Sequence, residues 1–170
     1  MRIDLKDTDS WIPRVVFESY CGENSDKLLS FYDKAVEKRK MTSMSLNWVA
    51  VLFLPAWLGY RRQWTTLATV TVIFAALPFL EVLFSFPIPN SGLLGSLIVI
   101  GLLANSTLLM NAQRDYMKLK QEGVDNDAIA NTLQNKASAS IPYAVLSSIG
   151  YLTVVFAMAT IANIVFAMPK

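Results

Sequence analysis

The sequence carries few side chains that could form a reactive centre. Its 170 residues include no histidine and a single cysteine, Cys21. A histidine base, nucleophile or metal ligand is therefore excluded, and one cysteine can form neither an internal disulfide nor a thiolate zinc site. No phosphate-binding glycine loop, serine nucleophile elbow or useful pair of carboxylates occurs. We predict a protein that is not an enzyme and that has no catalytic residues, metal site or cofactor.

The most distinctive polar feature is a pair of adjacent arginines within an otherwise uncharged region. Around this pair lie tryptophan and tyrosine residues, which prefer the headgroup level of a membrane and form an aromatic belt there. An arginine can bind a lipid phosphate through its planar fork of donors, and it can also anchor a helix at the cytoplasmic face. One arginine can bind a lipid phosphate and anchor a helix at the same time. The candidate lipid or interface residues are Trp48, Trp57, Tyr60, Arg61, Arg62 and Trp64.

Two further residues are candidates for a polar site within the membrane. Glu81 is the one acid inside a long apolar segment, and such carboxylates often serve an ion or proton pathway. We favour a structural or interfacial role for Glu81, because a transporter needs several such groups at mid-depth. Asn105 lies in a second apolar segment, where a hydrogen bond between helices is the ordinary explanation.

Charged residues make up 16% of the chain, and their clusters are separated by long uncharged runs. A run of about 18 or more apolar residues is typical of a transmembrane helix, because about 20 residues rising 1.5 Å each cross a hydrocarbon core of about 30 Å. We therefore predict an all-α membrane protein with about three transmembrane helices. They cover residues 64–86, 92–110 and 141–168, within a membrane bundle at residues 64–168.

A fourth apolar stretch, residues 46–60, is shorter and contains Pro55. As a helix it would measure about 22 Å, which is less than the hydrocarbon core. Apolar stretches of this length are more often re-entrant or interfacial. We predict one short re-entrant or interfacial helix here, with a short, distorted spanning helix as the alternative.

The basic residues indicate how the chain crosses the membrane, because lysine and arginine near membrane segments stay in the cytoplasm. If residues 46–60 do not cross, then residues 1–45, the arginine pair and the loop 111–140 are all cytoplasmic. The uncharged loop 86–92 is then external, and Lys170 is the one basic residue outside. The first 30 residues lack the pattern of a secretory signal, and a lone cysteine suits a reducing compartment. We expect an inner-membrane protein with a cytoplasmic N-terminus.

The N-terminal region 1–45 is predicted to carry an amphipathic cytoplasmic helix at residues 26–40. Apolar residues recur there at helical spacing, and Ser25 can cap the helix. The preceding stretch 14–21 could form a short strand, although a single strand is not stable alone.

The loop 111–140 is predicted to carry helical structure as well. The second transmembrane helix extends to Glu122 and ends at Gly123, because glycine commonly terminates helices. Asp125 then caps a short amphipathic helix to about Lys136. We expect the two cytoplasmic helices to form a small layer under the bundle or against a partner. The apolar side of the second helix consists of Ala128, Ile129 and Leu133.

Small residues on two of the predicted spans indicate close helix packing or self-association. This pattern is common in membrane helices and names no ligand. The residues are Gly92, Gly95, Gly101 and Ala104 on the second span, and Ala144 and Ser148 on the third.

The segment 45–64 resembles the bacterial membrane family catalogued as domain of unknown function 2628. Weaker similarity extends over roughly residues 20–165, including 19–35, Ala104–Asn105 and the region of Tyr116. Some family members carry a zinc ribbon, whose cysteines are missing here. The resemblance implies a membrane location and architecture and no established activity. It rests on Asn47, Trp48, Ala50, Trp57, Tyr60, Arg61, Arg62 and Trp64.

The leading hypothesis from the sequence is a small integral inner-membrane protein that acts by interaction. Its expected partners are membrane lipids, with a membrane protein or a second copy of the chain as further options. The alternative is a transporter or channel component that uses Glu81. A pore-forming phage or toxin protein is a related option, although such proteins seldom carry a tail of about 45 mixed-charge residues. Nucleic acid is not expected at a net charge of +2.

Overall fold

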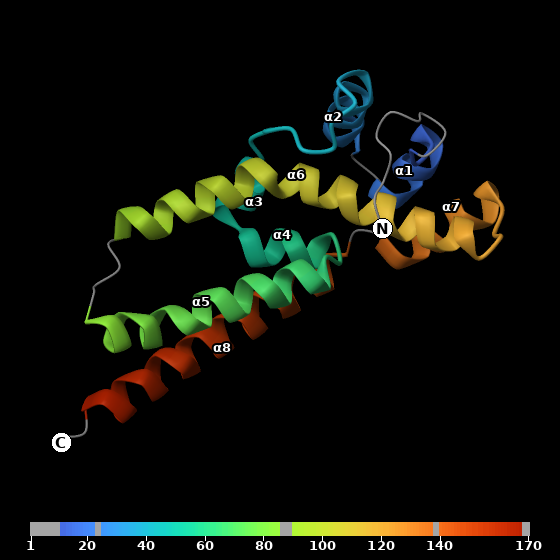
Figure 1. The fold of residues 1–170 in the computed structure, drawn as a ribbon. Coiled ribbons are helices and arrows are strands. Elements are labelled where there is room, and N and C mark those ends of the chain that lie inside the picture. The colour runs from blue at the N-terminus through green and yellow to red at the C-terminus, as the bar shows by residue number, and fades with distance from the viewer. Residues whose placement is uncertain (1–10, 23–24, 86–89, 138–139, 168–170) are drawn as a thin grey trace.

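The computed structural model describes residues 11–22, 25–85, 90–137 and 140–167, and all regular structure in these ranges is helical (Figure 1). Three helices are long and apolar enough to cross a membrane, which confirms the predicted fold class. The helices are α1 (Arg14–Cys21), α2 (Asp26–Glu37), α3 (Trp48–Leu52), α4 (Leu54–Tyr60), α5 (Trp64–Phe84), α6 (Asn90–Gln121), α7 (Asn126–Ala137) and α8 (Ile141–Ala167).

The three candidate spans are α5, α6 and α8. Helices α5 and α8 pack side by side, and α6 lies across from them with α3 and α4 between (Figure 1). Few residues of α5 and α8 are buried, and large apolar side chains are exposed along both helices, as expected for helices that contact lipid. Helix α6 continues without interruption well past the predicted end of its span at Met110. Residues 86–89 of the predicted external loop lie outside the described residues.

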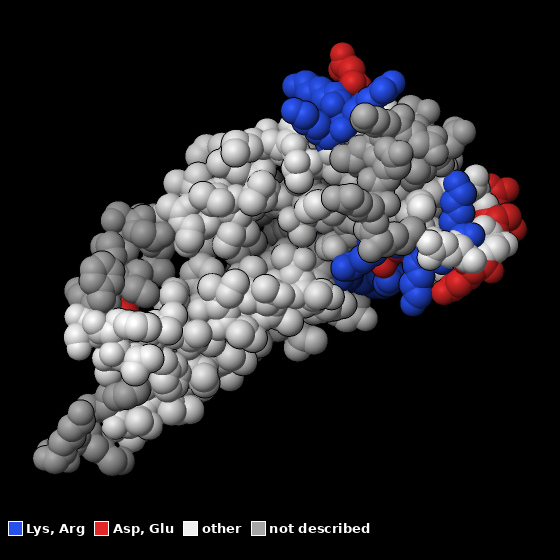
Figure 2. All heavy atoms as spheres, viewed as in Figure 1, with Lys and Arg blue, Asp and Glu red and all other residues white. Residues whose placement is uncertain are grey.

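Charged side chains gather at one end of the elongated molecule (Figure 2). This end contains α1, α2, α7, the C-terminal half of α6 and the start of α5 and α8, whereas the last turns of α5 and α8 lie at the opposite end (Figure 1). The segments that the charge pattern assigns to one side of the membrane therefore lie together. We call this part of the molecule the charged end.

Helix α1 corrects the interpretation of residues 14–21 as a possible strand. Helical spacing places its apolar residues on one face, whereas the alternation of a strand would leave about half of them exposed. Phe17 is fully buried and stacks on Tyr32 of α2, with 5.1 Å between the ring centroids. The Tyr32 hydroxyl also donates to the carbonyl of Ile12 at 2.6 Å. Burial of this face is what stabilises so short a helix.

Helix α7 forms as the sequence predicts. The backbone N–H of Ala128 donates to the Asp125 carboxylate at 2.8 Å, which caps the helix. Ile129 and Leu133 are fully buried where α7 packs against α1 and α6. Ser25 takes the N-cap position of α2, but its side chain makes no capping hydrogen bond.

The apolar stretch 46–60 forms two short helices that meet at Phe53. Pro55 lies in the first turn of α4, where its missing N–H costs no hydrogen bond. Helix α3 packs on α6, and α4 packs on α8 and α5. Both contacts involve a glycine: Gly101 of α6 lies against Val51, and Gly59 of α4 lies against Ser147 of α8. The segment joins the two parts of the bundle, and its place relative to a membrane interface remains a prediction.

Candidate functional site

A groove of about 670 Å³ lies between α2, α4 and the extended segment that leads into α3. We call it the aromatic groove. It brings together five of the eight residues that the sequence singled out, and it adds Asp26 and Lys27 from the first turn of α2. The five are Trp48, Trp57, Tyr60, Arg61 and Asn105.

The floor of the aromatic groove is a polar contact between the segment 43–47 and α6. The backbone N–H groups of Ser45 and Asn47 donate to α6 carbonyls at 3.1 and 3.2 Å. The Asn47 amide donates to the Asn105 side-chain oxygen at 3.0 Å, and the Asn105 amide donates to the Ser45 hydroxyl at 3.2 Å. Gly101 supplies one of the accepting carbonyls, because without a side chain it allows this close approach. Asn105 therefore bonds to an extended segment and not, as predicted, to a neighbouring helix.

Arg61 is the buried charged side chain in the wall of the groove, since it is only 8% exposed whereas Asp26 and Lys27 are exposed. Its Nη1 donates to the Cys21 carbonyl at 2.5 Å, and its guanidinium lies 5.3 Å from the centre of the Tyr60 ring. Its Nε is buried without a hydrogen-bond partner in the described parts of the chain. No carboxylate there forms an ion pair with Arg61. A buried cation paired only with neutral groups favours an anion nearby.

Cys21 supplies the carbonyl that accepts from Arg61, but its thiol is not reactive. Burial raises the pKa of this thiol to about 12, although Arg61 lowers it in part. The thiol is therefore protonated at neutral pH, and a protonated thiol is a poor nucleophile. Cys21 acts here through its backbone and its packing.

The aromatic residues of the groove differ in exposure. Trp57 is buried, whereas Trp48 is 63% exposed and lies at the open side. Trp57 therefore shapes the wall, and Trp48 is available to contact a ligand or lipid. Asp26 and Lys27 are both exposed, so the groove offers groups of both signs.

Arg62 and Trp64 do not join the aromatic groove, although the sequence placed them in one set with Arg61. The backbone at Arg62 has a φ of 50°, which turns its side chain to the other side of the chain. Its Nη1 donates to the Asn135 carbonyl at 2.8 Å, and its guanidinium lies 4.7 Å from the centre of the Tyr143 ring. Trp64 packs edge-on against the same ring. Both residues line a separate, smaller cavity.

Glu81 also lies away from the aromatic groove. It is half-buried in the last turn of α5, at the end of that helix opposite Trp64. The structure does not bring it together with Asn105, the other polar residue proposed for the membrane region.

The sequence reasoning missed a polar network that joins α1 to α6. The Gln63 amide donates to the Tyr20 hydroxyl at 2.9 Å, and the Asn111 amide donates to Gln63. The backbone N–H of Ile12 donates to the fully buried Gln113 side chain at 2.7 Å. One sequence signal could have indicated this network. Gln63 directly follows the arginine pair, and Asn111 directly follows the second apolar run.

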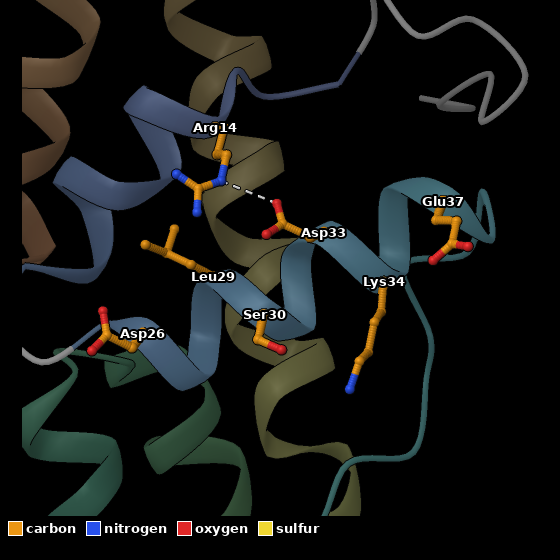
Figure 3. Close-up of a pocket in the computed structure, with 7 residues that line it drawn as sticks. All are labelled: Arg14, Asp26, Leu29, Ser30, Asp33, Lys34 and Glu37. Carbon is orange, nitrogen blue, oxygen red and sulfur yellow. Dashed lines mark hydrogen bonds and ion pairs between the residues drawn. The ribbon is translucent and has the colours of Figure 1, made fainter.

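A third cavity, of about 350 Å³, lies between α1 and α2 and is lined by charged residues of both signs (Figure 3). Asp26 and Glu37 lie at opposite ends of α2 and do not converge. Asp33 accepts a 3.1 Å hydrogen bond from Arg14, which joins the two helices. Across the described ranges, no cluster of three or more acidic, cysteine or histidine side chains could hold a metal ion.

Comparison with known proteins identifies one related family. A family model described as "Protein of unknown function (DUF2628)" matches residues 18–114. This range begins within α1 and ends in α6, and it contains every residue that lines the aromatic groove. No curated protein and no solved structure matches the chain.

Proposed function

We propose a function for the aromatic groove from the premise that the chain belongs to the DUF2628 family, whose members have no known function. The protein is a small multi-pass membrane protein that binds a phospholipid headgroup in this groove. It acts by binding, and we assign it no reaction. The observation that carries the proposal is Arg61, a buried cation in the groove wall that has neutral partners and no ion pair with a described carboxylate.

The size and lining of the groove support a lipid headgroup as the ligand. Its volume of about 670 Å³ falls within the usual range for small-molecule sites of about 300–1,000 Å³. Aromatic side chains line it, and tryptophan and tyrosine favour the level of the headgroups. A phosphate would offset the charge of Arg61 through the planar fork of its donors.

The mixed charge of the groove favours a zwitterionic headgroup, such as that of phosphatidylethanolamine. Arg61 and Lys27 suit the phosphate, whereas Asp26 suits the ammonium group. The exposed face of Trp48 also attracts an ammonium group through its π system. A purely anionic headgroup would leave Asp26 without a favourable partner.

The proposal includes a location in the bacterial inner membrane with a cytoplasmic N-terminus. Three apolar helices and the gathering of basic residues at the charged end support it (Figure 2). In this orientation the aromatic groove opens beside α2 on the cytoplasmic side.

Native mass spectrometry of the full chain in detergent tests the proposal, with phosphatidylethanolamine and phosphatidylcholine as probes. Lys27→Gln removes an exposed cation that lines the groove, and Lys34→Gln is its matched control two turns further along α2. We expect Lys27→Gln to weaken phosphatidylethanolamine binding about fivefold, since one surface cation contributes about 1 kcal/mol to headgroup binding. Lys34→Gln should have no effect.

Arg61→Gln should abolish the binding, and circular dichroism should show whether this variant retains its helices. Trp48→Ala provides a second variant at an exposed residue if Arg61→Gln does not fold. Glu81→Gln should leave lipid binding unchanged, because Glu81 lies outside the groove. Equal binding by Lys27→Gln and Lys34→Gln would contradict the proposal. Recovery of the chain with a stoichiometric protein and no lipid would favour a membrane-protein partner instead.

A further inference from the structure

A second, smaller cavity of about 130 Å³ lies on the other side of the arginine pair. We call it the basic pocket. Its cations come from three places that are distant in sequence: the turn before α5, the C-terminal half of α6 and the end of α7. It is lined by Tyr20, Arg62, Gln63, Trp64, Thr65, Asn111, Arg114, Asp115 and Lys136.

Positive charge exceeds negative charge in the basic pocket. Three of its lining residues are cations, and one, Asp115, is an anion. Lys136 is paired with Asp115 at 2.8 Å, so the charge of that pair is balanced. Arg62 and Arg114 form no ion pair with a described carboxylate, which leaves an excess charge of about two.

The arginine at the back of the pocket is held in a defined position. Arg62 donates to the Asn135 carbonyl and lies over the Tyr143 ring, so one side of its guanidinium is engaged. These partners are neutral and do not offset its charge. Arg114 is exposed and can move toward a ligand. The pocket thus combines one fixed cation with one adaptable cation.

The pocket lies where two candidate spans begin. Trp64 and Thr65 form the first turn of α5, whose partial positive charge adds to that of the arginines. Trp64 and Tyr143 of α8 form an edge-on aromatic pair beside it, with 5.4 Å between the ring centroids. Aromatic pairs at the ends of spans are typical of the headgroup level. A ligand here would be at the depth of lipid phosphates.

We infer that the basic pocket binds the phosphate of an anionic phospholipid. Basic pockets between membrane helices on the cytoplasmic side are suited to such headgroups. The cavity has room for a phosphate and not for a whole headgroup, so the remainder of the lipid lies along the exposed starts of α5 and α8. This site is distinct from the aromatic groove, and its excess of two positive charges is larger than that of the groove, where Lys27 and Arg61 face one anion, Asp26.

Binding of phosphatidylglycerol by the full chain in detergent tests the inference. Phosphatidylcholine, which is zwitterionic and has no net charge, is the reference. Arg114→Gln removes an exposed cation of the pocket, and Lys118→Gln is its matched control one turn further along α6 and outside the pocket. We expect the dissociation constant for phosphatidylglycerol to rise about fivefold in Arg114→Gln and to be unchanged in Lys118→Gln. Phosphatidylethanolamine binding should not change in either variant, which separates this test from that of the groove.

Inorganic phosphate serves as a second probe, because a free phosphate shares the same chemistry. Binding of inorganic phosphate without any preference for phosphatidylglycerol would overturn the lipid assignment. Equal weakening by Arg114→Gln and Lys118→Gln would show general attraction to charge and would overturn the site. So would unchanged phosphatidylglycerol binding in Arg114→Gln. The double variant Arg114→Gln/Lys136→Gln should weaken phosphatidylglycerol binding further. If the double variant does not fold, the result for Arg114→Gln alone decides whether the pocket binds this lipid.

Discussion

Arg61 and Arg62 are neighbours in the chain, yet they serve two different cavities. Arg61 ends α4 and is buried in the wall of the aromatic groove, where it contacts Cys21 of α1. Arg62 has a left-handed backbone conformation and faces the basic pocket, where it contacts the end of α7. The backbone conformation at Arg62 thus directs two adjacent arginines, which look like one site in the sequence, into two separate cavities.

The two cavities differ in the properties that select a ligand. The aromatic groove is the larger, has aromatic walls and carries charges of both signs. The basic pocket is small and has an excess of positive charge. An arginine does not specify its ligand by itself. The charged residues that other elements place beside the arginine select the ligand. In the aromatic groove these residues come from α2, and in the basic pocket they come from α6 and α7.

The two cavities also depend on different packing contacts. The groove depends on α3 and α4, which pack through glycines against α6 and α8. The pocket depends on α7, which is held against α1 and α6 by Ile129 and Leu133. A substitution in one of these contacts can therefore affect ligand binding at one cavity alone or at both.

The largest effect is expected from Leu133→Ala. Leu133 is fully buried between α7 and its neighbours, and truncation of such a leucine costs about 2–5 kcal/mol. We expect a clearly lower thermal unfolding temperature in detergent, together with weaker phosphatidylglycerol binding as α7 loosens. Gln134→Ala, at an exposed neighbouring residue, is the control. Phosphatidylethanolamine binding that fell to the same extent as phosphatidylglycerol binding would show that the two sites are not independent.

A smaller effect, on both sites, is expected from Gly59→Ala. A Cβ at Gly59 would overlap the Ser147 side chain and the Tyr143 carbonyl, so α4 must move away from α8. Overpacking of this kind costs about 1–3 kcal/mol. The movement would displace Arg61 and Arg62 together and weaken the binding of both lipids.

Gly150→Ala is the control for this change, because a Cβ there meets no atom within 4 Å. Its unfolding temperature should equal or exceed that of the unmodified chain, since alanine has a higher helix propensity than glycine. Its lipid binding should be unchanged. Wild-type stability in Gly59→Ala would mean that the contact between α4 and α8 is looser than described.

The smallest effect is expected from alkaline pH. Burial raises the pKa of Cys21 from 9.0 to about 12 and that of Tyr20 from 10.0 to about 12. Above pH 9 the unfolded chain loses protons that the folded chain keeps, so stability falls as the pH rises toward 12. For Cys21 the loss is of order 1 kcal/mol between pH 8 and pH 10.

Thermal unfolding at these two pH values, in the unmodified chain and in Cys21→Ser, measures the contribution of the thiol. The serine variant should show the smaller loss, because its hydroxyl does not titrate in this range. An equal loss in both proteins would show that the Cys21 thiol does not contribute.

Much of the architecture could be predicted because it depends on local patterns. The lengths of apolar runs indicate the three spans, and Asp125 followed by Ile129 and Leu133 indicates a capped amphipathic helix. The strand considered for residues 14–21 was wrong, because its apolar residues are buried by the neighbouring helix α2 and by α6 and α7, which are distant in sequence. The polar partners of Asn105 could not be predicted for the same reason.

The helical fold class and the three segments able to cross a membrane follow from local sequence, because length and apolar content are properties of each segment alone. The family resemblance stated from the residues around Trp48 and Arg61 is confirmed by the family model, which matches residues 18–114. Tertiary packing places Arg61 and Arg62 at different cavities, and it adds Lys27 to one cavity and Arg114 to the other. This is because a cavity forms only where elements pack against one another. Its charge comes from side chains that lie far apart in the sequence, and no local spacing pattern links them.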